Sequence, residues 1–91
     1  MKVFVVALSQ CEWYDIRHIC HSKETALKWF EELRQECIEN NRQMVDFCVK
    51  NNVSSKDYEV NIEALVNMIP GELPVVEYYD YPDLKEWELE E

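Results

Sequence analysis

The strongest candidate for chemistry in this 91-residue sequence is the stretch His18–His21, with Cys11 at the turn before it. On a strand, His18 and Cys20 share a face, whereas His21 points to the other face. Zinc takes four nitrogen or sulfur ligands in a tetrahedral arrangement, and this spacing matches none of the usual zinc patterns. The sequence therefore predicts no metal site and no cofactor, with a centre built on Cys11, His18 and Cys20 as an alternative.

Catalysis has little support elsewhere in the sequence. A cysteine nucleophile needs a neighbouring base, and Cys37 and Cys48 fall on apolar helical stripes where a buried thiol is inert. Gly71 is the only glycine, so the sequence contains no glycine-rich phosphate loop. Carboxylates are too widespread to mark one acid–base pair. We therefore expect a protein that is not an enzyme.

The charge balance limits the class of partner. The chain has 19 acidic residues against 9 Lys and Arg, a net charge of −10. This balance disfavours nucleic acid and anionic membrane surfaces, which attract Lys and Arg, and it favours a partner protein with a basic face. The N-terminal apolar run is too short for a secretion signal, and no run approaches the roughly 20 residues of a membrane span. We expect a cytoplasmic protein with reduced cysteines.

The first third of the sequence predicts an antiparallel hairpin. Residues 2–8 form a continuous apolar run typical of a buried strand, and residues 13–21 alternate between polar and apolar types. Four residues, 9–12, join the two runs, which indicates a tight connection. Strict alternation would place Tyr14, Ile16, His18 and Cys20 on one side of the second strand.

The middle of the sequence predicts helices. Ser22 is a plausible N-cap, and the apolar period of 3.6 residues continues to the pair Asn51-Asn52, as one long helix or as two. Residues 55–69 fit either an alternating strand or a helix that begins with a capping box at Ser54 and Asp57. We favour the helix, because it also explains the apolar residues that precede Pro70.

The C-terminal part predicts one or two further strands. Residues 73–79 form the first, residues 80–83 a turn, and residues 84–90 the second. The last strand would carry Glu86, Glu88 and Glu90 on one face, and Lys85, Trp87 and Leu89 on the other. The predicted fold is a single α+β domain over residues 1–91. Its antiparallel sheet combines the N-terminal hairpin with one or two C-terminal strands, and two or three helices pack on one face.

The sequence resembles a class of small phage and mobile-element proteins. The resemblance rests on "MKVFVV", "YDIRHI", "SKETALKWFEEL" and a late "EWELEE", which cover about half of the chain. The middle, Gln35–Leu73, is longer than in that class. The resemblance implies a mobile-element origin and a role in binding, and it carries over no functional residue.

Acidic residues concentrate at two places. Residues 77–91 hold seven acids and one base, and a second acidic row follows the long helix at Glu24, Glu31, Glu32, Glu36 and Glu39. Carboxylates in a row can occupy sites that a basic partner keeps for phosphates. We therefore expect an inhibitor of a host nucleic-acid-handling or defence protein, acting in the host cytoplasm. The predicted binding residues are Trp13, Glu77, Tyr78, Tyr79, Asp80, Tyr81, Asp83, Glu86 and Glu88.

Two alternatives remain beside this hypothesis. One is a small-molecule or nucleotide-like binding protein, with an aromatic pocket between sheet and helix that uses Trp13, Arg17 and His18. The other is the Cys and His metal centre described above. The sequence leaves the oligomeric state open.

Overall fold

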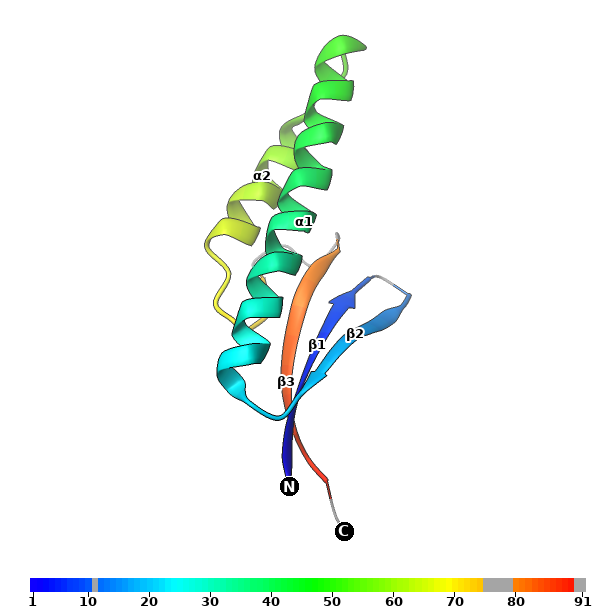
Figure 1. Cartoon of the computed structure of the whole chain (residues 1–91). Helices are drawn as coiled ribbons and strands as arrows, with labels where there is room; N and C mark the ends of the chain where they lie inside the picture. The colour runs from blue at the N-terminus through cyan, green and yellow to red at the C-terminus, as the bar shows by residue number, and fades with distance from the viewer. Residues whose placement is uncertain (11, 75–79, 90–91) are drawn as a thin grey trace.

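The chain folds as an α+β domain, as predicted. The computed structural model describes residues 1–10, 12–74 and 80–89. Its elements are β1 (Lys2–Ser9), β2 (Tyr14–Cys20), α1 (Lys23–Lys50), α2 (Lys56–Val66) and β3 (Tyr81–Glu88). The strands form one sheet, and the two helices lie together on one side of it (Figure 1).

The sheet is antiparallel with the order β2-β1-β3. Gln10 and Trp13 exchange backbone hydrogen bonds of 2.8 and 3.4 Å, which closes the predicted hairpin between β1 and β2. The last strand, β3, pairs with β1 along its whole length, from Lys2 opposite Glu88 to Ser9 opposite Tyr81. The apolar strand β1 is therefore paired on both sides, and β2 and β3 are the edge strands.

The two faces of the sheet have different surroundings. Phe4, Val6 and Leu8 of β1 pack against the helices, and we call their side of the sheet the helix face. The alternate residues Val3, Val5 and Ala7 lie on the other side, which we call the open face. Contacts between elements join α1 to all three strands and α2 to α1, so the described helices cover one face only.

A β-bulge changes the predicted alternation of β2. The register shifts between Val6, which pairs with His18, and Ala7, which pairs with Ile16. Because residues directly opposite each other share a face, His18 lies on the helix face and Ile16 lies on the open face. The prediction that Tyr14 and Ile16 share a side with His18 and Cys20 is therefore wrong. The extra residue of the bulge, Arg17, is the physical reason.

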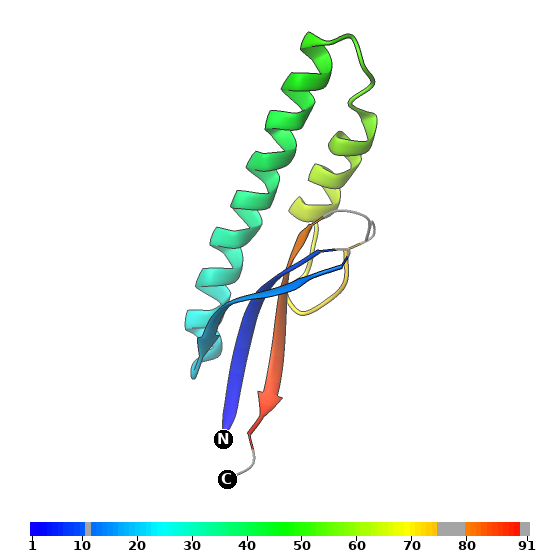
Figure 2. The same ribbon diagram turned by 90° about the vertical axis from the view of Figure 1, so that its right-hand side faces the viewer.

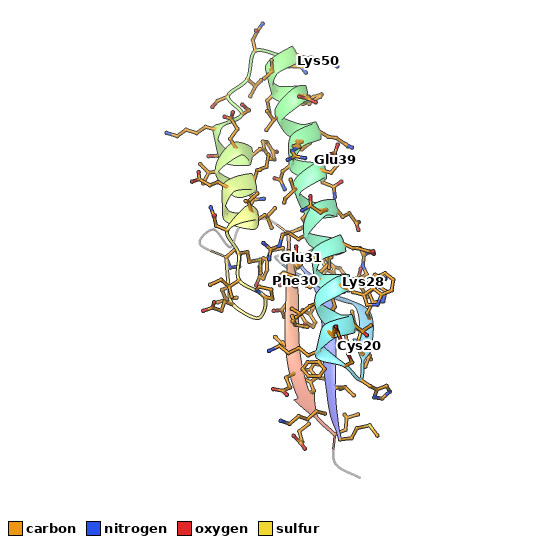
Figure 3. The ribbon with its side chains drawn as sticks, turned by 60° about the vertical axis from the view of Figure 1, so that its left-hand side comes forward. Cys20, Lys28, Phe30, Glu31, Glu39 and Lys50 are labelled. Carbon is orange, nitrogen blue, oxygen red and sulfur yellow. The ribbon has the colours of Figure 1, made fainter. Side chains whose placement is uncertain are left out.

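The hydrophobic core lies between the helix face and α1. Phe30 is fully buried there, between α1 and the sheet (Figure 3). The core cluster contains Val6, Leu8, Cys20 and Leu84 from the sheet, and Ala26, Phe30, Leu33, Cys37, Ile38, Leu65 and Met68 from the helices and the residues after them. The apolar stripe predicted on the long helix therefore faces the sheet.

Local interactions fix the start and end of each helix. The Ser22 hydroxyl accepts a 3.2 Å hydrogen bond from the Thr25 backbone amide, which confirms the predicted N-cap of α1. The long helix is continuous and ends at Lys50, with the predicted stop Asn51 as its C-cap. The second predicted helix is also confirmed. Its N-cap is Ser55, which makes no side-chain cap hydrogen bond, so the predicted capping box at Ser54 and Asp57 is wrong. Instead, the Ser55 hydroxyl donates to the Glu59 carboxylate.

The second helix, α2, runs back alongside α1 toward the sheet (Figure 2). Buried polar groups join the two helices. The Asn61 amide donates a 3.0 Å hydrogen bond to Oδ1 of Asn41, and the Asn41 amide donates to the Cys37 carbonyl at 2.8 Å. About two turns before Asn41 in α1, Arg34 donates to the Val66 carbonyl at the end of α2. These bonds satisfy polar groups that burial would otherwise leave unpaired, and they fix the relative position of the two helices.

The C-terminal part departs from the prediction at residues 80–83. The expected turn is wrong, because Tyr81, Pro82 and Asp83 belong to β3. Proline lacks a backbone donor but is tolerated in an edge strand, where only one side of the strand is paired. The expected strand 73–79 falls mostly outside the described residues, and Leu73 and Pro74 are not in a strand. Within the described ranges, no helix combines the length and apolarity of a bilayer span.

Candidate functional site

The structure separates the predicted binding residues into several environments. Trp13 is exposed at the hairpin turn, with 72% of its surface accessible, and Asp80 is exposed just before β3. Tyr81 is half-buried against the core. The remaining anchors of the prediction, Glu77, Tyr78 and Tyr79, lie outside the described residues.

Two residues of the predicted acidic row on the last strand lie near cations, and the third, Glu90, lies outside the described residues. Glu86 lies 3.5 Å from the Lys2 ammonium, and Glu88 lies 3.9 Å from the N-terminal amine. Both carboxylates are exposed, as expected, but each faces a positive charge from the neighbouring strand. Among the described residues, each of these two carboxylates is therefore offset by a nearby cation.

Asp83 links the two edge strands of the sheet through a buried hydrogen bond. It is 7% exposed and accepts a 2.8 Å hydrogen bond from the Tyr14 hydroxyl, which crosses β1 from the opposite edge strand. Lys85 lies 3.6 Å from the same carboxylate and 4.8 Å from the centre of the Tyr14 ring. Burial, followed by the hydrogen bond and charge of Asp83, raises the pKa of Tyr14. These contacts give Asp83 a structural role on the open face.

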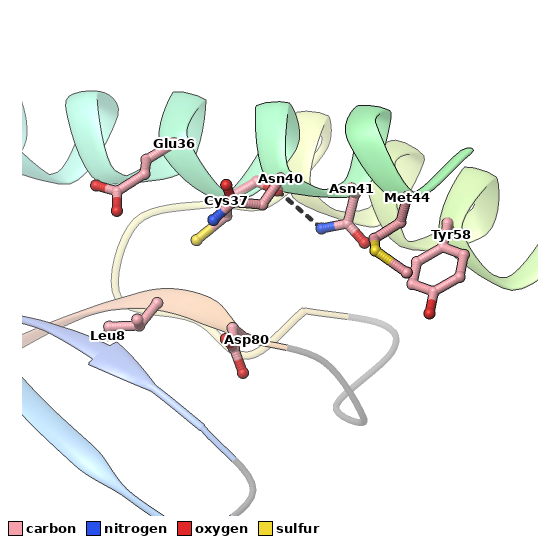
Figure 4. A pocket seen from close by; sticks show the side chains of 8 residues that line it. All are labelled: Leu8, Glu36, Cys37, Asn40, Asn41, Met44, Tyr58 and Asp80. Carbon is pink, nitrogen blue, oxygen red and sulfur yellow. Dashed lines mark hydrogen bonds between the residues drawn. The ribbon is translucent and has the colours of Figure 1, made fainter. Parts of the chain in front are cut away.

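A pocket forms where α1 passes over the end of β1. Its volume is about 220 Å³, and its lining consists of Leu8, Glu36, Cys37, Asn40, Asn41, Met44, Tyr58 and Asp80. Figure 4 shows the α1 side chains above Leu8 and Asp80, with Tyr58 of α2 at one end. The pocket therefore combines an apolar floor with two carboxylates, one from the helix and one from the start of β3.

A second pocket of about 230 Å³ continues along the same flank of α1 toward β2. It is lined by Arg17, His18, Trp29, Glu32, Leu33 and Glu36. The imidazole of His18 stacks on the Trp29 indole with ring centres 4.0 Å apart and nearly parallel planes. Arg17 is held by Asp15 at 2.7 Å. Because Glu36 belongs to both pockets, the two form one continuous surface.

We call the carboxylates of this surface, Glu32, Glu36 and Asp80, the acidic flank. All three residues are exposed. Their charge reaches the buried thiol beside them, because burial, followed by the charges of Asp80 and Glu36, raises the pKa of Cys37 to about 12. The nearby Arg17 lowers it by a smaller amount. Glu36 and Asp80 are also the charged side chains that line the first pocket, so its charged groups are acidic.

The candidate metal ligands do not come together in the described residues. His18 is occupied by its stack on Trp29, and Cys20 is buried in the core. Within residues 1–10, 12–74 and 80–89, no three Cys, His, Asp or Glu side chains could hold a metal ion. Cys11, the third residue of the predicted centre, lies outside these ranges.

Sequence reasoning found part of this surface. The helical acidic row contained Glu32 and Glu36, but they were not chosen as binding residues. The predicted aromatic pocket between sheet and helix named Arg17 and His18, which do line a pocket there, whereas Trp13 does not. The sequence signal for Glu32 and Glu36 was their spacing of four residues, which places both side chains on one flank of a helix.

Known proteins supply no further guide to this surface. Compared with family models, with curated proteins and with solved structures, the chain matches none. The functional argument therefore rests on the geometry and charge described above.

Proposed function

We propose that the chain is a non-enzymatic binding protein whose acidic flank takes a basic segment of a partner protein. The observation that carries this proposal is the pair of pockets that share Glu36 and lie along one side of α1. Each pocket offers apolar surface beside carboxylates. Lys and Arg side chains have the matching character, because their stems are apolar and their ends are cationic.

Charge and size both support this choice of partner. Glu32 and Asp80 have no ion pair among the contacts of the described residues, whereas Glu86 lies beside Lys2 and Glu88 beside the N-terminal amine. Sites for drug-sized molecules usually measure about 300–1,000 Å³. Each pocket here is smaller, at about 220 and 230 Å³, so each suits one side chain of an extended partner segment that runs along both pockets.

The biological setting follows from the resemblance and remains part of the proposal. A phage or mobile-element protein with such a flank would act in the host cytoplasm, on a host nucleic-acid-handling or defence protein. Its carboxylates would occupy the basic residues that this target uses for phosphates. Electrostatic steering would then speed the encounter and make it depend on salt.

The test uses a fluorescein-labelled arginine-rich peptide and fluorescence anisotropy. The variant Glu32→Gln/Glu36→Gln removes two charges from the acidic flank. Exposed ion pairs contribute about 0.2–1 kcal/mol each, so we expect binding to weaken about 2- to 30-fold. Raising the salt from about 0.05 M to about 0.3 M should also weaken binding by the wild-type chain, because the Debye length falls.

Two control variants remove the same charge elsewhere. Glu63→Gln/Glu72→Gln alters exposed acids that line neither of these two pockets, and we expect a change of less than about twofold. Glu86→Gln/Glu88→Gln tests the acidic row on β3. Equal losses in all three variants would show that only net charge matters, and a larger loss at Glu86 and Glu88 would move the interface to β3.

A small-molecule role is a second candidate, supported by the second pocket. Arg17 provides a cation there, and the stacked pair of His18 and Trp29 provides an aromatic surface. A thermal-shift series with nucleotides would reveal stabilisation by such a ligand. A rise in melting temperature that Arg17→Gln abolishes would favour this candidate over a basic protein partner.

A further inference from the structure

The two pockets beside the acidic flank lie about two helical turns apart along α1. The α1 residues of the second pocket are Trp29, Glu32, Leu33 and Glu36, and those of the first pocket are Glu36, Cys37, Asn40, Asn41 and Met44. The middles of these two sets are about seven residues apart in the sequence. At a rise of about 1.5 Å per residue, the helix therefore separates the two pockets by about 10–11 Å.

The sheet gives nearly the same separation from different residues. The second pocket is lined by His18, which pairs with Val6 of β1. The first pocket is lined by Leu8 and by Asp80, whose carboxylate accepts a 3.2 Å hydrogen bond from Gln10. Leu8 and Gln10 follow Val6 by two and four residues. At about 3.4 Å per residue these offsets are about 7 and 13 Å, with a mean of about 10 Å.

Each pocket offers carboxylates to one cation of a partner. Glu36 and Asp80 line the first pocket, and Glu32 and Glu36 line the second. Arg17 also lines the second pocket, but Asp15 offsets its charge at 2.7 Å. Two cationic side chains about 10 Å apart therefore match the two pockets together.

This separation favours one backbone conformation of the partner segment. Side chains on one side of a β-strand repeat at about 6.8 Å and again at about 13.5 Å, whereas every third residue of a polyproline II helix returns to the same side after about 9.3 Å. An α-helix reaches about 10.5 Å only between residues seven apart. Short isolated helices are marginal in water, whereas polyproline II is a major conformer of unfolded segments. A short basic segment therefore reaches both pockets most readily in the polyproline II form.

We propose that the partner segment carries two cationic side chains three positions apart, one for each pocket, in an extended polyproline II conformation. This inference rests on the proposed function, because it specifies the sequence pattern that the acidic flank binds. Figure 4 shows Glu36 on the helix side of the first pocket and Asp80 on its sheet side, where one of the two cations is bound. The other cation is bound beside Glu32 in the second pocket, with its apolar stem along Leu33.

Nuclear magnetic resonance titrations of the full chain with short blocked peptides test the proposal at low salt, where exposed charges are least screened. Each peptide contains two arginines among serine and alanine residues, placed two, three, four or seven positions apart, so that the net charge is constant. An exposed ion pair changes affinity about 1.5- to 5-fold, and we expect the three-position peptide to bind more tightly than the others by this factor. A peptide with the sequence Arg-Pro-Pro-Arg should bind at least as tightly, because proline favours the polyproline II conformation.

Two variants and a matched control report whether both pockets are filled together. Glu32→Gln acts on the second pocket and Asp80→Asn on the first. Each should weaken binding of the three-position peptide about 1.5- to 5-fold and remove its advantage over the other spacings. Glu63→Gln removes an exposed acid that lines neither pocket, and it should leave this advantage unchanged.

The outcomes separate this inference from the proposed function. Equal affinity at all four spacings would overturn the inference, whereas the proposed function would stand if Glu36→Gln still weakened every peptide. Tightest binding at seven positions would also overturn it and would indicate a helical partner segment. If none of the four peptides binds, the inference fails, and the proposed function fails with it only if Glu32→Gln/Glu36→Gln binds the arginine-rich peptide as tightly as the wild type.

Discussion

The buried bond between Asn41 and Asn61 gives the sharpest prediction for the fold. The side chains of these residues are 8% and 2% exposed, and they meet at 3.0 Å between α1 and α2. Asn61→Ala leaves Oδ1 of Asn41 buried without its donor. An unsatisfied buried polar group costs about 1–3 kcal/mol, and the smaller side chain adds a cavity cost. We therefore expect a loss of about 2 kcal/mol or more.

The double variant Asn41→Ala/Asn61→Ala separates the bond from the cavity. Neither residue then keeps an unpaired polar group, so the double variant should be more stable than the sum of the two single losses. The expected coupling energy is about 1–3 kcal/mol. The bond is relevant to the candidate site, because it holds α2, and with it Tyr58, against the first pocket.

Urea unfolding followed by circular dichroism measures all four proteins. With an m-value of about 1 kcal/mol per M, a loss of about 2 kcal/mol or more should lower the urea midpoint of Asn61→Ala by about 2 M or more. The m-value should stay the same, since the surface exposed on unfolding changes little. Strict additivity of the two single losses would refute the reasoning, because it would mean that the hydrogen bond contributes nothing to stability beyond packing.

Two further predictions concern the titratable groups near the sheet. The pKa of Cys37 is about 12 in the folded chain against an ordinary value of 9.0, so the unfolded chain loses this proton first as pH rises. Stability from Cys37 should be complete below about pH 9 and fall by up to about 1.4 kcal/mol per pH unit above it. Cys37→Ala should show a shallower slope in urea titrations, and equal slopes would contradict this. Tyr14→Phe removes the hydrogen bond to buried Asp83 and should lower the free energy of unfolding by about 1–2 kcal/mol. Thermal and urea unfolding measure this loss. No loss of stability would mean that Lys85 alone satisfies the carboxylate.

The sequence predicted the elements that have strong periodicity. The hairpin and both helices follow from alternation, from the 3.6-residue apolar period and from Ser22. The start of β3 was missed because Pro82 and Asp83 are typical turn residues, and only the position of this strand at the edge of the sheet permits them. The bulge at Arg17 was also missed, because an inserted residue leaves no periodic signal.

The candidate site was harder to predict than the fold, for a physical reason. The spacing of Glu32 and Glu36 places them on one flank of α1, but the rotation of this helix on the sheet decides what that flank faces. Similarly, the sequence predicted that Glu86 and Glu88 bind a partner, but the register of β3 on β1 places them beside Lys2 and the N-terminal amine. Tertiary packing supplies both pieces of information, and one strand or helix alone contains neither.

The length of α1 has a consequence for the local stability of the domain. Its 28 residues span about 42 Å, whereas an eight-residue strand spans about 26 Å, so the outer part of the helix pair extends past the sheet (Figure 1). There each helix can pack only on the other, and Phe47 and Val49 remain exposed. Amide hydrogens near Cys48 should therefore exchange through local opening of the outer helix turns. Those near Phe30 should exchange only when the whole domain unfolds.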